Sequence, residues 1–412
     1  MSSFTSFIYV LSFLSATGAQ WYNGANFYQI YPRSFMDSDG DGVGDLQGIK
    51  SKLQYLKGLG IDGVWLSPIY KSPMADFGYD ISDFRDIHDE FGTLQDFDEL
   101  SVACKKIGLR LILDFVPNHS SDEHEWFKRS EKREAGYEDY YIWRDGKLDM
   151  TSNIIVPPTN WLSAFRFSAW RWSHIRKQMY YHMVHYKQPD LNYRNPKLIQ
   201  EMNNILIYWM DKGVDGFRID AVPCLFEKMN PDGSFPDEPR TFDPNCDRYD
   251  DCSVQHIYVQ DQDETFDMVY QWRKLVDDYT TLKNIEPKIL MTESYARIDL
   301  IQRFYGNGIV EGAQVPFNFE LVKTVTKNST AEDYKSVVEK WLDSMPEGKM
   351  ANWVVSEIYM IIVEKIQLTF FSWVITTKAE PRQDLDKNAV ISSIFFFKLC
   401  QVSRSLIKAK NL

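Results

Sequence analysis

Three carboxylates lie at the ends of three short apolar runs of the sequence. Asp114 lies near the end of "LRLILDF", Asp220 closes "VDGFRID", and Glu293 follows "KILMT". Because neighbouring carboxylates raise each other's pKa values, a site that gathers them can keep one protonated as an acid and another ionised as a nucleophile. Glycoside hydrolysis uses such a pair. The residues alone leave a second interpretation open, in which the carboxylates form a structural salt-bridge network.

Alternating helices and strands must position these groups. "GIKSKLQYLKGLG" has the apolar spacing of a helix, and "TLQDFDELSVACKKIG" predicts another helix with Thr93 as its cap. A third helix begins at "NPKLIQ", with Asn195 as cap and Pro196 in the first turn, and a fourth covers about residues 266–276. A strand follows each of these helices, and this alternation favours a parallel sheet.

A TIM barrel and an open doubly wound sheet both fit this alternation. No glycine-rich phosphate loop follows the first strand, which weakens the dinucleotide-binding alternative. In a barrel, polar residues at the C-terminal strand ends form the active site, and the three carboxylates occupy such ends. We therefore predict an α/β fold of the TIM (β/α)8 type. Arg218, two residues before Asp220 and on the same strand face, can hold that carboxylate ionised.

Several motifs in the right order resemble one known family. "DFVPNH" (114–119), "GFRIDAV" (216–222) and "MTES" (291–294) resemble three signature regions of the α-amylase superfamily, glycoside hydrolase family 13. "QPDLN" (188–192) resembles a further signature, and "YQIYPRSFMDSDGDGVGDLQGI" resembles the start of the maltase subfamily. The likeness is closest to secreted insect maltases and runs from about Trp21 to Val355.

The resemblance implies a retaining α-glucosidase that releases terminal α-1,4-linked glucose from maltose, sucrose or short oligosaccharides. Asp220 would be the nucleophile and Glu293 the general acid/base, with Arg218 orienting the nucleophile and no cofactor needed for catalysis. The residues implied to contact or support the sugar are Tyr79 as stacking platform, Asp80 on the glucose hydroxyls, Asp114, Asn118, His119, Gln188 and Ala221. The small side chain of Ala221 resembles enzymes that prefer α-1,4 links.

The acidic stretch "DSDGDGVGD" resembles the first part of an EF-hand loop, although Gly48 stands where the closing Glu of that loop would be. Many members of the family bind calcium here, so the resemblance implies a structural Ca²⁺. A solvated acidic turn is the alternative. The implied ligands are Asp37, Asp39, Asp41, Asp45 and the carbonyl of Val43.

The resemblance also predicts the domain organisation. Residues 20–118 and 193–356 would form the barrel, and residues 119–192 would form the insertion called domain B after the third strand. Residues 357–412 show no family motif, and the family's C-terminal β-domain has no counterpart. In the insertion, Phe167 stands where the family usually has Gly, and Val184 where an aromatic residue is common.

The seventh-strand motif departs from the family. After "ANWVV" the sequence continues with Ser356 and Glu357, where the family usually has a His-Asp pair, and no His follows His256. The eighth strand also lacks a counterpart. We therefore expect a barrel that is incomplete at strands 7–8, and a 412-residue chain that is weakly active or inactive.

Other features predict a secreted protein. Residues 1–19 have the apolar run and small residues of a signal peptide. Asn328-Ser329-Thr330 is a glycosylation acceptor, and Cys246 and Cys252 flank "DRYDD" as a local disulfide would. The formal net charge of −12 argues against nucleic-acid binding, and no uncharged apolar run approaches the roughly 20 residues of a membrane span. The expected partner is a small oligosaccharide.

Two alternatives to a hydrolase stay open. Heavy chains of amino-acid transporters resemble the family without catalysing, but they carry a membrane helix and tend to lose the catalytic carboxylates that this chain retains. A transglycosylase or a sucrose isomerase would use the same residues as a hydrolase. The sequence does not show how well water competes for the covalent intermediate.

Overall fold

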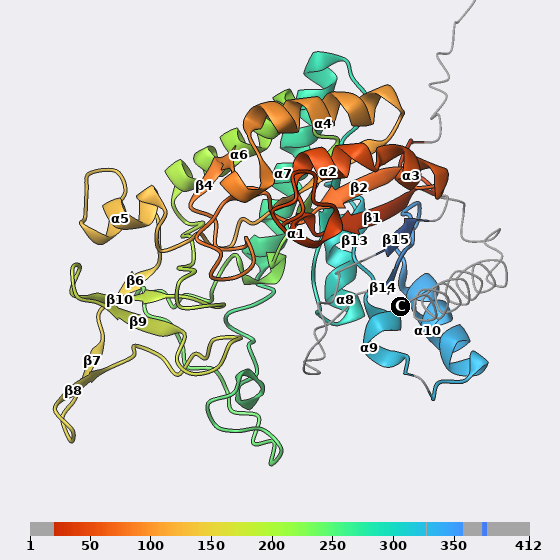
Figure 1. Ribbon diagram of the computed structural model, residues 1–412. Helices are drawn as coiled ribbons and strands as arrows, with labels where there is room; N and C mark the ends of the chain where they lie inside the picture. Colours follow the sequence, from red (N-terminus) through yellow and green to blue (C-terminus); the bar gives the residue numbers. More distant parts are fainter. Residues whose placement is uncertain (1–19, 327, 357–372, 377–412) are drawn as a thin grey trace, which may run out of the picture.

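The computed structural model describes residues 20–326, 328–356 and 373–376, so the predicted signal peptide and most of the predicted tail lie outside the described residues. Its centre is one curved sheet with the strand order β13-β12-β11-β5-β2-β1-β15-β14 (Figure 1). These strands are β1 (Asn26–Ile30), β2 (Gly63–Leu66), β5 (Arg110–Phe115), β11 (Gly216–Ile219), β12 (Ile289–Thr292), β13 (Val315–Pro316), β14 (Asn352–Ser356) and β15 (Trp373–Thr376). Neighbours from β1 to β13 pair in parallel, as predicted.

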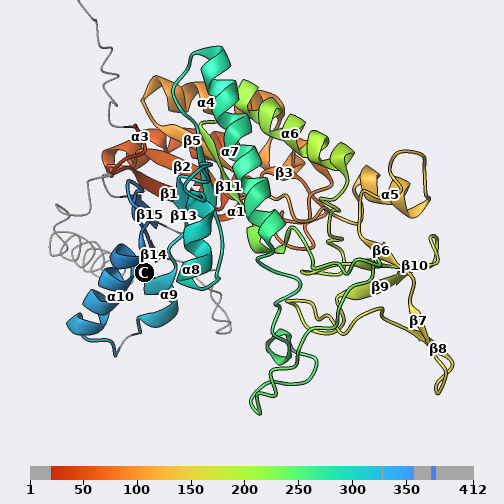
Figure 2. The same ribbon diagram turned by 180° about the vertical axis from the view of Figure 1, so that it is seen from behind.

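Helices connect these strands and cover the outside of the sheet (Figures 1 and 2). The α-helices are α1 (Pro32–Phe35), α2 (Leu46–Ser51), α3 (Leu53–Gly58), α4 (Leu94–Lys106), α5 (Glu125–Glu131), α6 (Pro196–Asp211), α7 (Asp263–Lys283), α8 (Ile298–Ile301), α9 (Glu320–Thr324) and α10 (Ala331–Ser344). Thr93 caps α4 through the backbone N–H of Asp96, and Asn195 caps α6 through that of Lys197, which confirms both predicted caps. The first predicted helix is divided at Lys52 into α2 and α3.

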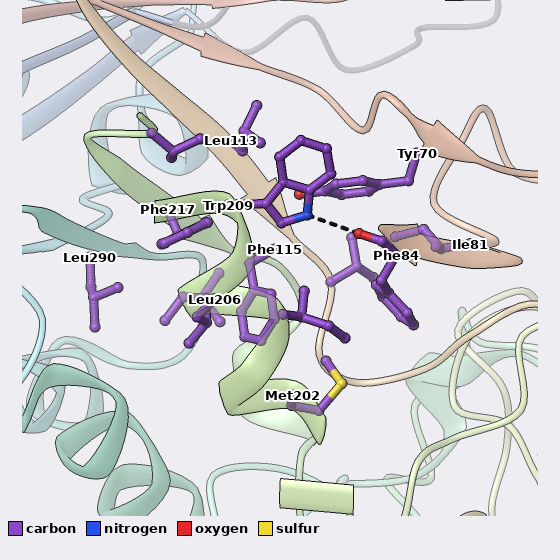
Figure 3. Packing of buried hydrophobic residues seen from close by; sticks show 14 of the residues in the cluster. Tyr70, Ile81, Phe84, Leu113, Phe115, Met202, Leu206, Trp209, Phe217 and Leu290 are labelled. Atoms are coloured by element: carbon purple, nitrogen blue, oxygen red, sulfur yellow. Dashed lines mark hydrogen bonds between the residues drawn. The ribbon is translucent and has the colours of Figure 1, made fainter. Parts of the chain in front are cut away.

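The alternation of side chains along the strands builds two cores. On β5, Leu111, Leu113 and Phe115 pack in the outer core against the helices, whereas Ile112 belongs to the core inside the sheet. In the outer core, the buried indole of Trp209 on α6 also donates a hydrogen bond to the backbone carbonyl of Phe84 (Figure 3). The side chains two residues beyond the inner core residues therefore point toward the top of the barrel interior.

The sheet is a partly formed TIM barrel. Asn352 on β14 links that strand to the edge at β13: its Nδ2 donates to the carbonyl of Pro316 (2.6 Å), and its Oδ1 accepts from the N–H of Asn318 (3.0 Å). β15 lies between β1 and β14 but pairs antiparallel with both. A complete (β/α)8 barrel has a parallel strand at that place. Within the described residues, the regular barrel thus ends after its seventh strand.

Between β5 and α6 the chain leaves the barrel in the excursion predicted as domain B. It holds α5 and five short strands, and it lies to one side of the barrel (Figure 1). Its strands are β6 (Trp143–Arg144), β7 (Lys147–Asp149), β8 (Ile154–Val156), β9 (Trp170–Ser173) and β10 (Gln178–Tyr181). β6, β10 and β9 form one small sheet, and β7 and β8 form a separate hairpin.

The remaining elements connect the barrel strands. A short pair, β3 (Tyr70–Lys71) and β4 (Asp83–Ile87), follows β2. The 3₁₀ helices are η1 (Asp89–Phe91), η2 (Val222–Cys224), η3 (Asp251–Ser253) and η4 (Gln302–Tyr305). Across the part of the chain that the structure covers, no helix combines the length and the apolar character that crossing a bilayer requires.

Candidate active site

Three adjacent parallel strands bring the three carboxylates to one end of the barrel. The register pairs Arg218 on β11 with Asp114 on β5, and the backbone N–H of Glu293 donates to the carbonyl of Ile219 on β11. Asp114, Asp220 and Glu293 share the strand face of inner-core residues such as Ile112, so all three side chains enter the barrel at its C-terminal end. The sequence-based placement of the three carboxylates at one site is confirmed.

Arg218 is the common partner of all three carboxylates. Its Nη1 lies 2.8 Å from Asp114 Oδ1 and also contacts Asp220 Oδ1, while its Nη2 lies 2.7 Å from Glu293 Oε1. The guanidinium side chain is only 5% exposed. A buried guanidinium is costly unless it is paired, and here each partner is an acidic group. The arrangement therefore fixes the relative positions of Asp220 and Glu293.

Asp114 supports the site from behind. Its Oδ2 accepts hydrogen bonds from Trp65 Nε1 (3.1 Å) and from the Tyr79 hydroxyl (3.2 Å), and its backbone carbonyl accepts from the Tyr70 hydroxyl (2.6 Å). With Arg218 on the other carboxylate oxygen, both oxygens of Asp114 have protein partners, and Asp114 is not part of the cavity wall. It holds Arg218 and the Tyr79 ring in place.

Burial raises the pKa values of the two remaining carboxyl groups. It raises the pKa of Glu293 to about 7, against the opposing charge of Arg218 and with a smaller upward effect from Asp220. Burial also raises the pKa of Asp220, to about 6, and Arg218 opposes that shift too. The raised pKa of Glu293 suits a group that holds a proton near neutral pH, as a general acid must, and the contact with Arg218 favours the ionised form of Asp220.

The residue after Asp220 contributes through its backbone. Ala221 has φ 44° and ψ 31°, a left-handed conformation that is uncommon for a residue with a Cβ atom. In this conformation its N–H donates to Glu293 Oε2 (3.1 Å). Strained backbone of this kind occurs at functional sites, where the surrounding structure maintains it. Here it gives Glu293 a second fixed partner besides Arg218.

These groups line a cavity of about 640 Å³, a size typical of small-molecule sites. Asp220, Glu293 and Arg218 lie on its wall with Tyr79 and His119. More exposed side chains surround the mouth, and they include Phe77 (56% exposed), Phe165 (55%) and Tyr295 (40%). The cavity thus has a charged inner part and an aromatic, open part.

Asp80 is not brought into the cavity. It is completely buried, and its carboxylate accepts hydrogen bonds from Ser72 Oγ (2.9 Å) and from the backbone N–H groups of Ala75 (2.8 Å) and Asp76 (2.9 Å). All three donors belong to its own loop, and Asp80 is not part of the cavity wall, so its contact with the glucose hydroxyls stays a prediction. The cavity instead receives Asp76, which the sequence analysis missed.

His119 and Gln188 form a polar pair beside Asp76. Burial lowers the pKa of His119 to about 4, so its imidazole is neutral at physiological pH. Gln188 is fully buried behind the wall, where its Nε2 lies 3.0 Å from Asp76 Oδ2 and 3.1 Å from His119 Nε2. His119 and Asp76 face the cavity, whereas Gln188 positions them. The sequence "ADFGYD" does not show which of its two Asp residues faces the cavity. The loop geometry distinguishes Asp76 from Asp80.

The acidic loop before α2 gathers part of its predicted ligand set. One carboxylate oxygen from each of Asp37, Asp39 and Asp45 lies within 4.8 Å of the others, a spacing that fits a cation with oxygen ligands. Asp41 is not in this group, and its Oδ1 accepts a hydrogen bond from the N–H of Val43 (2.7 Å). None of these four Asp residues lines the cavity that Asp220 and Glu293 share.

The predicted disulfide between Cys246 and Cys252 is present, with the two Cα atoms 6.0 Å apart. Among the described residues, Cys104 and Cys224 are free cysteines, and Cys104 is buried as expected for a core thiol. Cys224 lines the cavity, and burial raises the pKa of its thiol, which disfavours the thiolate form.

Comparison with known proteins agrees with this geometry. The family described as "Alpha amylase, catalytic domain" matches residues 29–357. Maltase A1 of Drosophila melanogaster is 52% identical over 348 residues, covering 84% of this chain and 60% of that protein. The salivary alpha-glucosidase of Anopheles gambiae is 54% identical over 334 residues, covering 81% of this chain and 56% of that protein.

A solved structure supports the fold as well. The alpha-glucosyl transfer enzyme XgtA superposes with a TM-score of 0.70 at 35% sequence identity, over 80% of this chain and 59% of that one. The chain spans a little over half the length of each of these relatives. With the family matched over most of its length and the strand-end carboxylates in place, this chain belongs to the α-amylase family through its catalytic domain.

Proposed function

We propose that this chain is built as a retaining α-glucosidase that acts on maltose, sucrose or short α-linked oligosaccharides. The observation that carries the proposal is the bridge formed by Arg218 between Asp220 and Glu293 on the wall of one cavity. The maltases and alpha-glucosidases among its relatives support the same activity. The preference for a terminal α-1,4 link rests on the small side chain of Ala221.

In the proposed first step, an Asp220 oxygen attacks the anomeric carbon of the terminal glucose. Glu293 gives its proton to the glycosidic oxygen, the bond to the leaving sugar breaks, and a glycosyl-Asp220 ester forms. Arg218 keeps Asp220 ionised before the attack, and the raised pKa of Glu293 keeps its proton available. In the second step, ionised Glu293 takes a proton from water, and that water releases glucose from Asp220.

We expect the 412-residue chain to turn over slowly. After Val355 the sequence does not supply the His-Asp pair that the resemblance leads us to expect at the end of strand seven. If each missing preorganised contact is worth about 3 kcal/mol in the transition state, the rate falls by several orders of magnitude. Purified protein assayed on p-nitrophenyl α-glucoside checks this, and maltase-like turnover would contradict it.

Product analysis separates hydrolysis from transfer. A retaining hydrolase releases α-glucose first, which NMR detects before mutarotation, whereas a transglycosylase makes longer sugars and an isomerase makes a rearranged disaccharide. The likeness to an alpha-glucosyl transfer enzyme makes transfer the second candidate. A non-catalytic role is less favoured, because Asp220 and Glu293 are both retained and aligned.

We also propose that the protein is secreted and that it binds one structural Ca²⁺. Relatives named as salivary enzymes support secretion, and the gathered carboxylates of Asp37, Asp39 and Asp45 support the ion. Asn328 is exposed, which suits the proposed glycosylation. Mass spectrometry of the protein from a secreting cell tests the glycan and signal cleavage, and metal analysis of the dialysed protein tests the ion.

A further inference from the structure

The turn at residues 163–167 forms one side of the cavity mouth. Ala164 and Phe165 line the cavity there. Arg166 and Phe167 both have left-handed backbone conformations, with φ values of 80° and 66°. Two consecutive residues with Cβ atoms are strained in this region, which glycine would occupy freely. Contacts from outside the turn must therefore hold it in this shape.

The charged contacts come from the loop closed by the disulfide, residues 246–252, which we call the disulfide loop. Arg166 forms ion pairs with two of its residues, Asp250 (2.9 Å) and Asp247 (3.1 Å). The three side chains are about half exposed, and exposed ion pairs are individually weak. Because the disulfide closes the loop, the carboxylates of Asp247 and Asp250 can both stay directed at Arg166, and the simultaneous pairing of Arg166 with both becomes favourable.

Backbone contacts complete the attachment on both sides of the turn. The N–H of Phe167 donates to the carbonyl of Tyr249 in the disulfide loop (2.8 Å), and the two rings lie 5.8 Å apart. On the opposite side, the N–H of Ala164 donates to the carbonyl of Met183, which also lines the cavity (2.8 Å). The turn is thus held between the cavity wall and the disulfide loop.

We propose that the disulfide loop positions Phe165 at the cavity mouth through Arg166 and Phe167, and thereby sets how tightly the second sugar of a substrate is held. The proposal rests on the proposed function, since it takes the cavity to bind a glycoside. A terminal glucose at the carboxylates would leave the next unit beside Phe165. Arg166 is then a positioning residue that touches no substrate, and the substitution of Phe for the usual Gly at position 167 is compensated by the disulfide loop.

Sugar binding without turnover gives the direct test. In the full 412-residue chain carrying Glu293→Gln, calorimetry measures the dissociation constants of glucose and of maltose. Adding Arg166→Ala should weaken maltose binding by about fivefold, the loss of one modest contact, and change glucose binding less than about twofold. Arg129→Ala is the matched control, because Arg129 forms a partly exposed ion pair with Glu134 (2.8 Å) elsewhere in the same excursion.

Further variants separate positioning from general damage. The double variant Cys246→Ser with Cys252→Ser should reproduce the selective loss of maltose affinity and should speed hydrogen exchange in residues 159–170. Exchanging the charges, with Arg166→Asp and Asp250→Arg together, should recover part of that affinity. Equal losses for glucose and maltose, an effect of Arg129→Ala of the same size, or unchanged exchange in the serine variant would overturn the proposal.

The proposed function can fail separately from this inference. If the parent binds neither sugar, the glucosidase proposal fails, and with it the role of the turn in sugar affinity. The exchange measurement would then decide alone whether the disulfide loop holds the turn.

Discussion

The carboxylate cluster and the mouth of the cavity are held in place by different kinds of contact. Asp114, Arg218 and Glu293 belong to adjacent parallel strands or their ends, where backbone register fixes each side chain before any polar contact forms. The mouth consists of loop residues such as Phe165, whose turn is held by side chains of a distant loop. The site thus joins a carboxylate cluster fixed by strand register to a wall that depends on a few weak contacts.

This difference suggests where function and stability separate. Groups at the C-terminal strand ends should dominate the chemistry, whereas groups at the opposite ends of the same strands should affect stability alone. Side chains in the loops should affect which sugars bind and the stability of the fold. The predictions below run from the largest expected effect to the smallest.

The largest effect should come from removing the charge of Asp220, the proposed nucleophile. Asp220→Asn should reduce turnover to the uncatalysed background, because an amide cannot form the glycosyl ester. Asp215→Asn is the matched control: this residue lies just before β11, where its carboxylate accepts a hydrogen bond from the N–H of Leu111 (3.0 Å). A stopped assay on p-nitrophenyl α-glucoside compares the turnover of the two variants. Equal losses of turnover would contradict the claim that the chemistry depends on the C-terminal strand ends alone.

Removing Arg218 should cost stability as well as activity. Arg218→Met leaves three buried carboxylates without their common counter-charge, which should destabilise the fold by about 3–5 kcal/mol at neutral pH. Arg110→Met, on the neighbouring strand β5, removes more exposed ion pairs and should cost about 1 kcal/mol or less. Urea unfolding measures both free energies. A cost for Arg218→Met as small as that for Arg110→Met would contradict a buried charge network.

Removing calcium should affect stability and leave the cluster intact. If the acidic loop binds Ca²⁺ at a concentration 100 times its dissociation constant, chelation should remove about 2.7 kcal/mol of stability. Asp39→Asn should give most of that loss in the presence of calcium and little further loss on chelation. Thermal melting with and without chelator reports this. A melting temperature that does not change on chelation would favour the alternative, a solvated acidic turn that binds no calcium.

The two carboxyl groups should give a bell-shaped pH profile of kcat/KM. Asp220 must be ionised, so activity should fall about tenfold per unit as pH drops below about 6. Glu293 must be protonated, so activity should also fall as pH rises above about 7. The alkaline limb should be weaker with p-nitrophenyl α-glucoside than with maltose, because a good leaving group needs less protonation. Identical alkaline limbs for the two substrates would argue against Glu293 as the acid.

The strand-end chemistry could be predicted from the sequence because it depends on local pattern. The alternation of helices and strands indicates parallel order, and strand parity indicates which side chains face inward. Asp114, Asp220 and Glu293 therefore come together wherever the barrel forms. The sequence predicts the contact between Arg218 and Asp220, because the two residues share one strand face. The contacts of Arg218 with Asp114 and Glu293 depend on the register between strands, which the sequence does not give.

Loop geometry could not be predicted in the same way. Asp76 and Asp80 lie four residues apart in one glycine-containing loop, and hydrogen bonds within the loop decide that Asp80 turns inward while Asp76 reaches the cavity. In the acidic loop, the backbone path brings Asp37, Asp39 and Asp45 together and leaves Asp41 outside the group. The left-handed turn at Arg166 depends on residues about 80 positions later in the chain, a separation that no local pattern reveals.

The most direct test of the central claim is to trap the covalent intermediate. A 5-fluoro-α-glucosyl fluoride should react slowly with the full chain and raise its mass by one fluoroglucosyl group, and peptide mapping should place that group on Asp220. The label should be absent from the Asp220→Asn variant and present in Asp215→Asn. A label on another residue, or measurable glucose release from a substrate with no label at any time, would contradict the assignment of Asp220 as the nucleophile.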